Sequence, residues 1–564
     1  MRKIELLAPA GSLGTLKAAV SSGADSIYLG MNKFNAREYA TNFNKDYLKE
    51  AVKICKSNNV KLYLTMNTLV KNSELKEFFE QLKYAYEQGI DSVIIQDPSF
   101  IEIIKESFPD LHIHLSTQAG VMNSAHANLF SNINRINLAR ELTKENIKLI
   151  RKNYNKELEI FIHGALCACI SGSCYFSSLL GGRSGNRGKC AQPCRKLYNN
   201  LYLFSTKDLC LIDKLPEIIN LGIDSLKIEG RMRNPYYVAT VTSIYRKAID
   251  SFYDKKFNIT EKMRSDLKNS FFREFTQGKF ENEFVFNPNQ VLKDINIQEK
   301  EYKVNLKSIN IKRKSNLKEI KIKEKNSSGK QLIVRVYNEK DALIAEKYAD
   351  IIVLDLFNKD FENIKIKKPL YALTPRIMFD SDLDNIVKRI KEISPDGLVA
   401  GNLGILNLNL NLPIILDNNS NCFNDLQLNY YNKLGAKPII SQELKLRELE
   451  YFKNKDFIVF VHGKIRLMTL AHDLKEQIVK DEKGFNFNIK KIYNGVEVLN
   501  EKELGLFNQI SYILKAGINQ LYIDTEENLG EVLQIYRNIL DNKPIKIARL
   551  KKRYVMGWSK QGTL

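Results

Sequence analysis

Four cysteines in the first half of the chain have the residue type and spacing of metal ligands. Cys167, Cys174, Cys190 and Cys194 are arranged as C-x6-C-x15-C-x3-C. Thiolates are soft ligands that suit zinc or iron–sulfur clusters. Structural zinc sites mostly use two closely spaced pairs, and only the last pair is that close here. The spacing favours an iron–sulfur cluster and leaves zinc open, and Cys169 is an alternative to Cys167 as ligand.

The segment around these cysteines is rich in glycine and in basic residues. Glycine backbone can wrap closely around a group larger than one ion, and its N–H groups can reach the sulfur atoms. The positive charges would offset a negatively charged cluster or attract an anionic substrate. These residues are Gly181, Gly182, Gly185 and Gly188, with Arg183, Arg187, Lys189, Arg195 and Lys196. The isolated Cys55, Cys210 and Cys422 are interpreted as ordinary buried thiols.

Eight short apolar runs, separated by segments with helical periodicity, precede and follow the cysteines. Such alternation predicts parallel strands with helical crossovers, and eight of them predict a (β/α)8 TIM-type barrel with a cysteine-rich insertion at its mouth. The runs are Ile4–Leu7, Ser26–Leu29, Lys61–Thr65, Ser92–Gln96, His112–Ser116, Arg135–Leu138, Glu159–His163 and Ser225–Glu229.

The second half of the chain repeats the first in a degenerate form. Lys207–Glu229 aligns without gaps on Lys502–Asp524, and Phe161–Gly164 matches Phe460–Gly463. Matches in the same order predict a second barrel-like α/β domain. The position of Cys167 becomes Arg466 in this copy, so the copy cannot bind a cluster in the same way. We expect it to be a packing partner or a substrate platform.

Two further residues are candidates for catalysis. His163 ends the seventh predicted strand, directly before the cysteines, where it could donate a proton or form a structural hydrogen bond. Its counterpart His462 persists in the copy that lacks the cysteines, which favours the structural role. Arg140 follows the sixth strand and is replaced by Gln442 in the copy. A guanidinium there could bind a carboxylate or a phosphate.

These patterns divide the chain into four parts. We predict the cluster-bearing barrel over 1–233, a helical and β linking region over 234–330, the degenerate repeat over 331–540 and a basic tail over 541–564. Within the linking region, Lys303–Lys330 alternates apolar and basic residues. That alternation predicts exposed strands with a cationic face, either solvated or facing RNA.

Composition indicates a globular protein with an anionic partner. Hydrophobic residues make up 44% and charged residues 27% of the chain, and the formal charge is +21. A potential of that sign attracts nucleic acid, although a lysine-rich composition bias gives the same count. The N-terminal residues lack the features of a signal peptide, and no apolar run is long enough to cross a membrane. We expect a cytoplasmic protein.

Several motifs give the chain a resemblance to a known family. EIFIHGALCACISGSCYFS at Glu159–Ser177 resembles the signature of the peptidase U-32, or collagenase-like, family, except that Phe176 stands where the signature prefers an aliphatic residue. Five more stretches fit the same family: Leu6–Ser12, Ser116–Gly120, Ala139–Thr143, Gly188–Arg195 and Ser225–Arg231. The resemblance covers about residues 1–290.

The resemblance implies an oxygen-independent RNA hydroxylase. Members of this family include oxygen-independent hydroxylases with a four-cysteine [4Fe-4S] cluster, whose ligands match Cys167, Cys174, Cys190 and Cys194. Some hydroxylate the tRNA wobble uridine, others a cytidine of 23S rRNA, with prephenate linked to the reaction as hydroxyl source. The long second region resembles the ribosomal-RNA type. A peptidase, or a non-catalytic RNA-binding protein with a structural cluster, remains the alternative.

Overall fold

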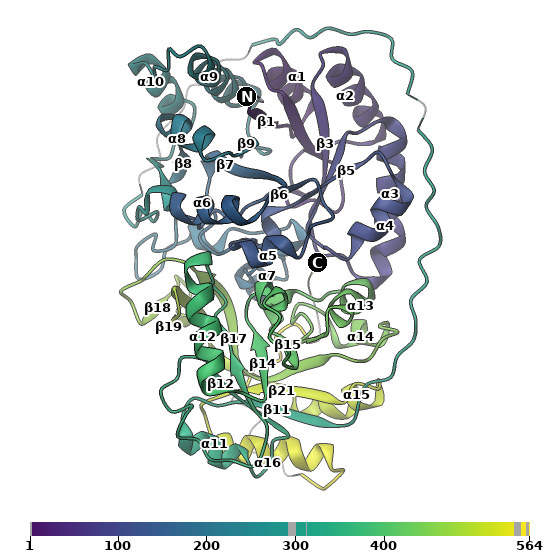
Figure 1. Ribbon diagram of the computed structural model, residues 1–564, viewed down its shortest axis with the longest axis vertical. Coiled ribbons are helices and arrows are strands. Elements are labelled where there is room, and N and C mark those ends of the chain that lie inside the picture. Colours follow the sequence, from purple (N-terminus) through teal and green to yellow (C-terminus); the bar gives the residue numbers. More distant parts are fainter. Residues whose placement is uncertain (1–2, 291–299, 312, 546–553, 560–562, 564) are drawn as a thin grey trace. The chain divides into compact units, whose positions relative to one another are not determined.

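The computed structural model describes residues 3–290, 300–311, 313–545, 554–559 and 563 of the chain. Its contacts divide into two compact units, each built around one sheet (Figure 1). The first unit comprises Met1–Val70, Glu74–Gly172 and Gly185–Glu319, and the second comprises Lys71–Ser73, Ser173–Ser184 and Ile320–Leu564.

The first unit is a closed barrel of eight parallel strands, which confirms the predicted (β/α)8 fold. The barrel closes because β9 pairs in parallel with both β1 and β7. Each strand falls on a predicted run, with ends displaced by at most two residues. The strands are β1 (Glu5–Pro9), β2 (Ser26–Gly30), β3 (Lys61–Met66), β4 (Ser92–Ile95), β5 (His112–Leu115), β6 (Arg135–Asn137), β7 (Glu157–Ala165) and β9 (Ser225–Ile228).

Helices follow most of these strands and cover the outside of the barrel (Figure 1). Their N-termini are fixed locally, because side chains of Ser12, Asn44, Thr143 and Asn234 accept hydrogen bonds from backbone N–H groups of the first turn. The helices are α1 (Leu13–Ser21), α2 (Lys45–Ser57), α3 (Leu75–Gln88), α4 (Phe100–Ser107), α5 (Ser124–Asn128), α6 (Lys144–Asn153), α8 (Leu215–Asn220) and α9 (Pro235–Tyr253).

A buried ion network fills one layer of the barrel interior. Arg135 on β6 pairs with Glu5 on β1 at 2.5 Å and with Glu159 on β7 at 3.2 Å. Lys227 on β9 pairs with Glu159 at 2.8 Å. Because β1 and β6 are not neighbours in the sheet, these side chains meet across the barrel. Burial tends to raise the pKa of Glu5, but the Arg135 guanidinium outweighs it and lowers that pKa to about 2.

The linking region is helical and extended. Beyond α9 lie α10 (Glu261–Asn269) and the two-residue strand β10 (Phe275–Thr276), which pairs with β8 (Asp208–Cys210). The strands expected over Lys303–Lys330 are wrong: the described residues there form no ladder, only one isolated bridge from Lys325. The chain instead runs along the barrel helices, with Lys307 N donating to Ser57 Oγ at 2.9 Å. Its alternation reflects packing, since Ile311 covers Gly89 at the end of α3.

The second unit repeats the barrel topology in a curled sheet, as expected for a degenerate copy. Strands β11 to β16 follow one another in parallel, and β21 pairs with β11 and β17. They are β11 (Gln331–Arg335), β12 (Ile351–Asp355), β13 (Leu370–Leu373), β14 (Gly397–Ala400), β15 (Ile414–Leu416), β16 (Ala436–Pro438), β17 (Ile458–Leu470) and β21 (Gln520–Asp524).

The two units differ most after the shared His-Gly pair. In the first, β7 ends at Ala165 and the cysteine segment begins. In the second, β17 continues to Leu470 and pairs with β20 (Gly495–Gly505), which is followed outward by β19 (Asn486–Ile492) and β18 (Ile478–Lys480). A β-hairpin structure therefore replaces the cysteine loop. In the described part of the chain, no helix is long and apolar enough to cross a membrane.

Candidate functional site

The cysteine segment begins at the carboxyl end of β7, where barrel enzymes place their chemistry. Cys167 and Cys194 are half-buried and Cys190 is exposed, whereas Cys169 is only 1% exposed. Half-buried Cys174 lies in Ser173–Ser184, which packs within the second unit. In the described part of the chain, no three His, Cys, Asp or Glu side chains gather around a point that would hold a single metal ion.

The Cys190–Cys194 turn has a feature common among thiolate ligands. The backbone N–H of Gln192 donates to Cys190 Sγ at 3.3 Å. Gln192 adopts a left-handed conformation with φ of 55°, and a short 3-10 helix over Pro193–Arg195 follows it. An N–H group directed at sulfur stabilises the thiolate form and tunes a bound cluster.

Two arginines supply positive charge next to the thiols of the first unit. Arg195 donates to Thr206 Oγ1 at 2.8 Å and to the carbonyl oxygen of Leu166 at 3.4 Å, so it joins the two ends of the cysteine segment. Burial and Arg273 lower the pKa of Arg195, and the thiols of Cys194 and Cys167 oppose that shift.

The second arginine, Arg37, lies near Cys190. Arg37 Nη2 donates to Glu229 Oε1 at 2.9 Å, and Glu229 is the main cause of its raised pKa, with a smaller contribution from Cys190. Arg37 was not among the sequence candidates, because it lies in the loop after β2 and carries no motif.

Arg140, a candidate for substrate binding, holds the cysteine segment in this structure. Its Nη1 donates to the carbonyl oxygen of Ala165 at 3.0 Å, and its Nη2 donates to Ser171 Oγ at 2.9 Å. The guanidinium also lies over the Phe161 ring, 5.2 Å from its centroid. Arg140 therefore spans the loop that contains Cys167. This geometry favours a positioning role.

His163 lies near the carboxyl end of β7 and is buried. It is 1% exposed, and its Nδ1 lies 3.4 Å from the hydroxyl of Tyr245 on α9. Burial, together with the charge of Arg233, lowers the pKa of His163 to about 3, so the imidazole is neutral at physiological pH. Its surroundings favour the structural alternative.

Glycines let the cysteine segment lie directly on the barrel loops. A Cβ atom added to Gly172 would lie 2.1 Å from the carbonyl oxygen of Gln118, and one added to Gly188 would lie 2.0 Å from that of Asn35. Both residues have a positive φ, of 86° and 81°. Any side chain would therefore displace the segment.

The residue after Cys174 is anchored within the second unit. The Tyr175 hydroxyl donates to Asn421 Oδ1 at 2.6 Å and to the carbonyl oxygen of Asn418 at 3.2 Å. Its backbone N–H donates to Leu467 at 2.8 Å. The ring of Tyr175 also meets Trp558 edge-on, with centroids 6.2 Å apart. The single Trp of the C-terminal tail thus has a packing role that the sequence did not indicate.

The fold and the cysteine segment define a (β/α)-barrel protein with a thiol-rich loop at the mouth of the barrel. A model of the family described as peptidase family U32 matches residues 11–287 and 363–544, so both units are included. The chain belongs to this family. Membership confirms the resemblance found in the sequence and places the chain in a family of enzymes.

Curated relatives of the chain carry different names. An uncharacterized protease of Methanocaldococcus jannaschii is 40% identical over 49% of this chain and 73% of its own length. The tRNA hydroxylation protein P1 of Bacillus subtilis is 38% identical over 44% of this chain and 64% of its own length. The 23S rRNA 5-hydroxycytidine C2501 synthase of Escherichia coli is 34% identical over 45% of this chain and 40% of its own length. The last two relatives are therefore matched over less than two thirds of their length.

Proposed function

We propose that this protein hydroxylates a pyrimidine base in RNA without O2. Family membership and the two relatives named for RNA hydroxylation carry this proposal. The first candidate substrate is a cytidine of 23S rRNA, converted to 5-hydroxycytidine, and the second is the wobble uridine of a tRNA. The charge of +21 supports an RNA partner.

In this proposal Cys167, Cys174, Cys190 and Cys194 hold a [4Fe-4S] cluster. The residues present fit such a group: the N–H of Gln192 points at Cys190 Sγ, and Arg37 and Arg195 place positive charge beside three of the thiols. When bound, the cluster supplies one-electron redox chemistry. Arg140 and the glycine contacts keep the thiol-bearing loop in place.

The substrate base has to reach the barrel mouth. An enzyme pocket cannot enclose a base that is stacked and paired inside a helix. The target nucleotide is therefore unpaired, or is flipped out of its helix. We propose prephenate as the source of the hydroxyl group, in line with the family resemblance.

A peptidase is the second candidate, favoured by the family name and by the relative named as a protease. A cysteine nucleophile needs a histidine base within hydrogen-bond reach. His163, the histidine nearest in sequence to the cysteine segment, is directed at Tyr245 and has a pKa of about 3, which disfavours a role as base.

Anaerobic purification followed by iron, sulfide and visible-absorption measurements tests the cluster. We expect about four iron atoms per chain, lost in Cys194→Ser and retained in the control Cys55→Ala, whose thiol is on the buried face of α2. A colourless protein with one zinc would contradict the cluster.

Nucleoside mass spectrometry of rRNA and tRNA from a deletion strain tests the reaction. Loss of 5-hydroxycytidine from 23S rRNA, restored by the wild-type gene and not by Cys194→Ser, would identify the first substrate. Loss of a hydroxyuridine from tRNA would identify the second. Intact hydroxypyrimidines in both RNAs, with peptide cleavage by the purified protein, would favour the peptidase.

A further inference from the structure

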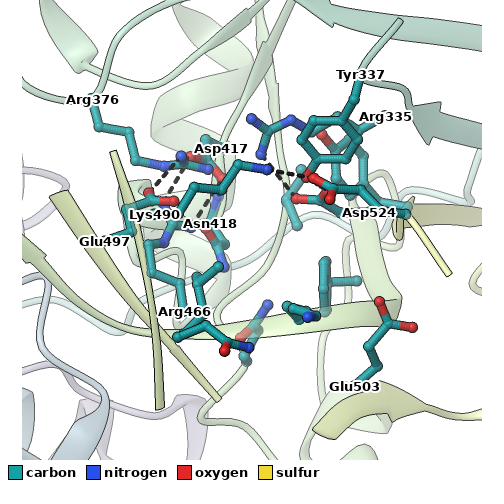
Figure 2. A pocket seen from close by; sticks show the side chains of 18 of the residues that line it. Arg335, Tyr337, Arg376, Asp417, Asn418, Arg466, Lys490, Glu497, Glu503 and Asp524 are labelled. Carbon is teal, nitrogen blue, oxygen red and sulfur yellow. Dashed lines mark hydrogen bonds and ion pairs between the residues drawn. The ribbon is translucent and has the colours of Figure 1, made fainter. Parts of the chain in front are cut away.

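The second unit contains a cavity that the proposed reaction does not use. It has a volume of about 360 Å³ and lies entirely within that unit. Three guanidinium groups, from Arg335, Arg376 and Arg466, and the ammonium of Lys490 line it (Figure 2). A cavity of this size is typical of small-molecule sites.

The cavity lies in the second unit at the position that corresponds to the candidate site of the first unit. Arg466 stands at the place of Cys167, Gln442 at that of Arg140 and Asp524 at that of Glu229, and all three line the cavity. Asp417 caps a short 3-10 turn as Ser116 does in the first barrel. Ligand sites in barrel folds lie at this end of the strands.

The acidic side chains of the cavity already have protein partners. Asp417 pairs with Arg376 at 2.5 Å and with Arg466 at 3.3 Å. Asp524 accepts from Arg335 at 3.1 Å and from the Tyr337 hydroxyl at 2.5 Å. Glu497 pairs with Arg376 at 2.7 Å and with Arg466 at 3.5 Å. These carboxylates orient the guanidinium groups, and the acidic side chains of the lining match the basic ones in number, so the lining has no net formal charge.

The basic side chains retain unused donors. Each guanidinium carries five N–H groups. The Nε atoms of Arg335 and Arg466 are buried and have no hydrogen-bond partner among the described residues, and these side chains are only 10% and 7% exposed. Lys490 lies at the rim, where its Nζ pairs with Glu526 at 2.5 Å. The two unpaired Nε donors favour a ligand that brings acceptor oxygen atoms to the guanidinium groups.

We propose that this cavity binds a small organic anion through a carboxylate or phosphate group. Oriented guanidinium groups bind both oxyanions strongly. The rings of Tyr337, Phe460 and Tyr522 also line the cavity and provide an apolar wall for the rest of the ligand. The limited volume favours a small molecule over an RNA chain. This binding is independent of the hydroxylation proposed above.

Isothermal titration calorimetry of the full chain tests the site. The probes are succinate and inorganic phosphate, with uncharged succinamide as the neutral comparison. Lys490→Gln removes a rim charge and Arg335→Gln removes a buried donor. Lys388→Gln is the matched control, because that lysine is 76% exposed and lies on α12 (Leu383–Ile393), outside the cavity. Thermal melting checks that each variant is folded.

We expect one saturable site for at least one anion and none for succinamide. The affinity should fall about tenfold in Arg335→Gln, by a smaller factor in Lys490→Gln, and stay unchanged in Lys388→Gln. Whichever of succinate and phosphate binds more tightly shows whether the site prefers a carboxylate or a phosphate group. The proposal is overturned if neither anion binds more tightly than about 10 mM, or if Lys490→Gln and folded Arg335→Gln bind as wild type does. It is also overturned if only a short RNA oligonucleotide binds in a Lys490-dependent manner.

Discussion

The hydroxyl of Tyr245 lies 3.4 Å from Nδ1 of His163 and donates to the carbonyl oxygen of Ile162 at 3.0 Å. In the second unit, the hydroxyl of Tyr536 lies 3.4 Å from Nδ1 of His462 and donates to the carbonyl oxygen of Val461 at 2.9 Å. The same contact thus joins the last helix to the equivalent strand in both barrels. Its presence beside β17, which no cysteine segment follows, argues that the contact serves the fold.

Replacing His163 is expected to affect stability more than chemistry. His163→Gln should lower the free energy of unfolding by about 1–3 kcal/mol because buried polar partners are left unmatched, while the visible spectrum of the cluster stays unchanged. The histidine is neutral when folded, with a pKa of about 3 against an ordinary value of 6.5. The unfolded chain therefore binds the extra proton, and stability falls as the pH drops from about 6.5 towards 3.

Urea unfolding at several pH values checks this, with His462→Gln as the matched variant. The variant of His163 should show a weaker pH dependence than wild type in that window. Unchanged stability together with lost hydroxylation would instead assign His163 to the reaction.

Arg140→Met is expected to reduce iron retention. The guanidinium bridges Ala165 and Ser171 on either side of Cys167, and methionine cannot form these bonds. Arg140→Lys should restore the positive charge but not the two simultaneous hydrogen bonds. We therefore expect it to restore little of the lost iron. Iron content and the visible spectrum of freshly purified protein are the measurements. Full iron content with weakened RNA hydroxylation would point to a substrate contact.

Cys167 and Cys169 should respond differently to substitution. Cys169 is 1% exposed, whereas Cys167 is half-buried beside Arg195. We expect Cys167→Ser to lose the cluster and Cys169→Ser to keep it with a modest loss of stability. Loss of iron in Cys169→Ser, with iron retained in Cys167→Ser, would make Cys169 the ligand.

Arg135→Met is expected to destabilise the first barrel by about 3–5 kcal/mol, because it leaves buried carboxylates without a counter-charge. Glu5 has a pKa lowered from 4.5 to about 2, so its favourable contribution is complete above pH 4.5 and is lost as the pH falls towards 2. The difference between wild type and variant should therefore shrink at low pH.

Chemical unfolding monitored at pH 7 and at about pH 3, inside the window set by the pKa of Glu5, measures this difference. Lys33→Met serves as control, because its pair with Glu77 is about half exposed and contributes little. Equal effects of the two substitutions would contradict a special role for the buried network.

Tyr175→Ala should loosen the segment that carries Cys174. The variant loses the bonds to Asn421 and Asn418 and the ring contact with Trp558. We expect faster tryptic cleavage after Arg183 than in wild type, with Phe485→Ala, a substitution of an exposed side chain, as control. Cleavage at the wild-type rate would show that Tyr175 does not hold the segment.

The barrel was predictable because its strands are short apolar runs with regular helical spacing, and because the second half repeats them. The cysteine motif was predictable from residue type and spacing. Arg195 was among the basic residues expected to offset the charge of a cluster. The position of Arg37 near Cys190 was not predictable, since its partner Glu229 is distant in the sequence.

The buried ion network could not be predicted from the sequence either. Arg135 and Lys227 look like solvated charges within apolar strands, and only the closure of the barrel brings them to Glu159. The alternation in Lys303–Lys330 was misleading for a related reason. A period of two arises in any extended chain with one side against a surface, so it does not distinguish a sheet from a chain lying on helices.

The anchoring of Tyr175 has a consequence for synthesis of the chain. Its partners Asn421, Leu467 and Trp558 follow it by hundreds of residues. During translation the first barrel has all its strands once residue 228 has been made, yet the segment beside Cys174 has none of these partners on the ribosome until much later. Final packing of this segment therefore has to wait until these residues of the second unit have been synthesised.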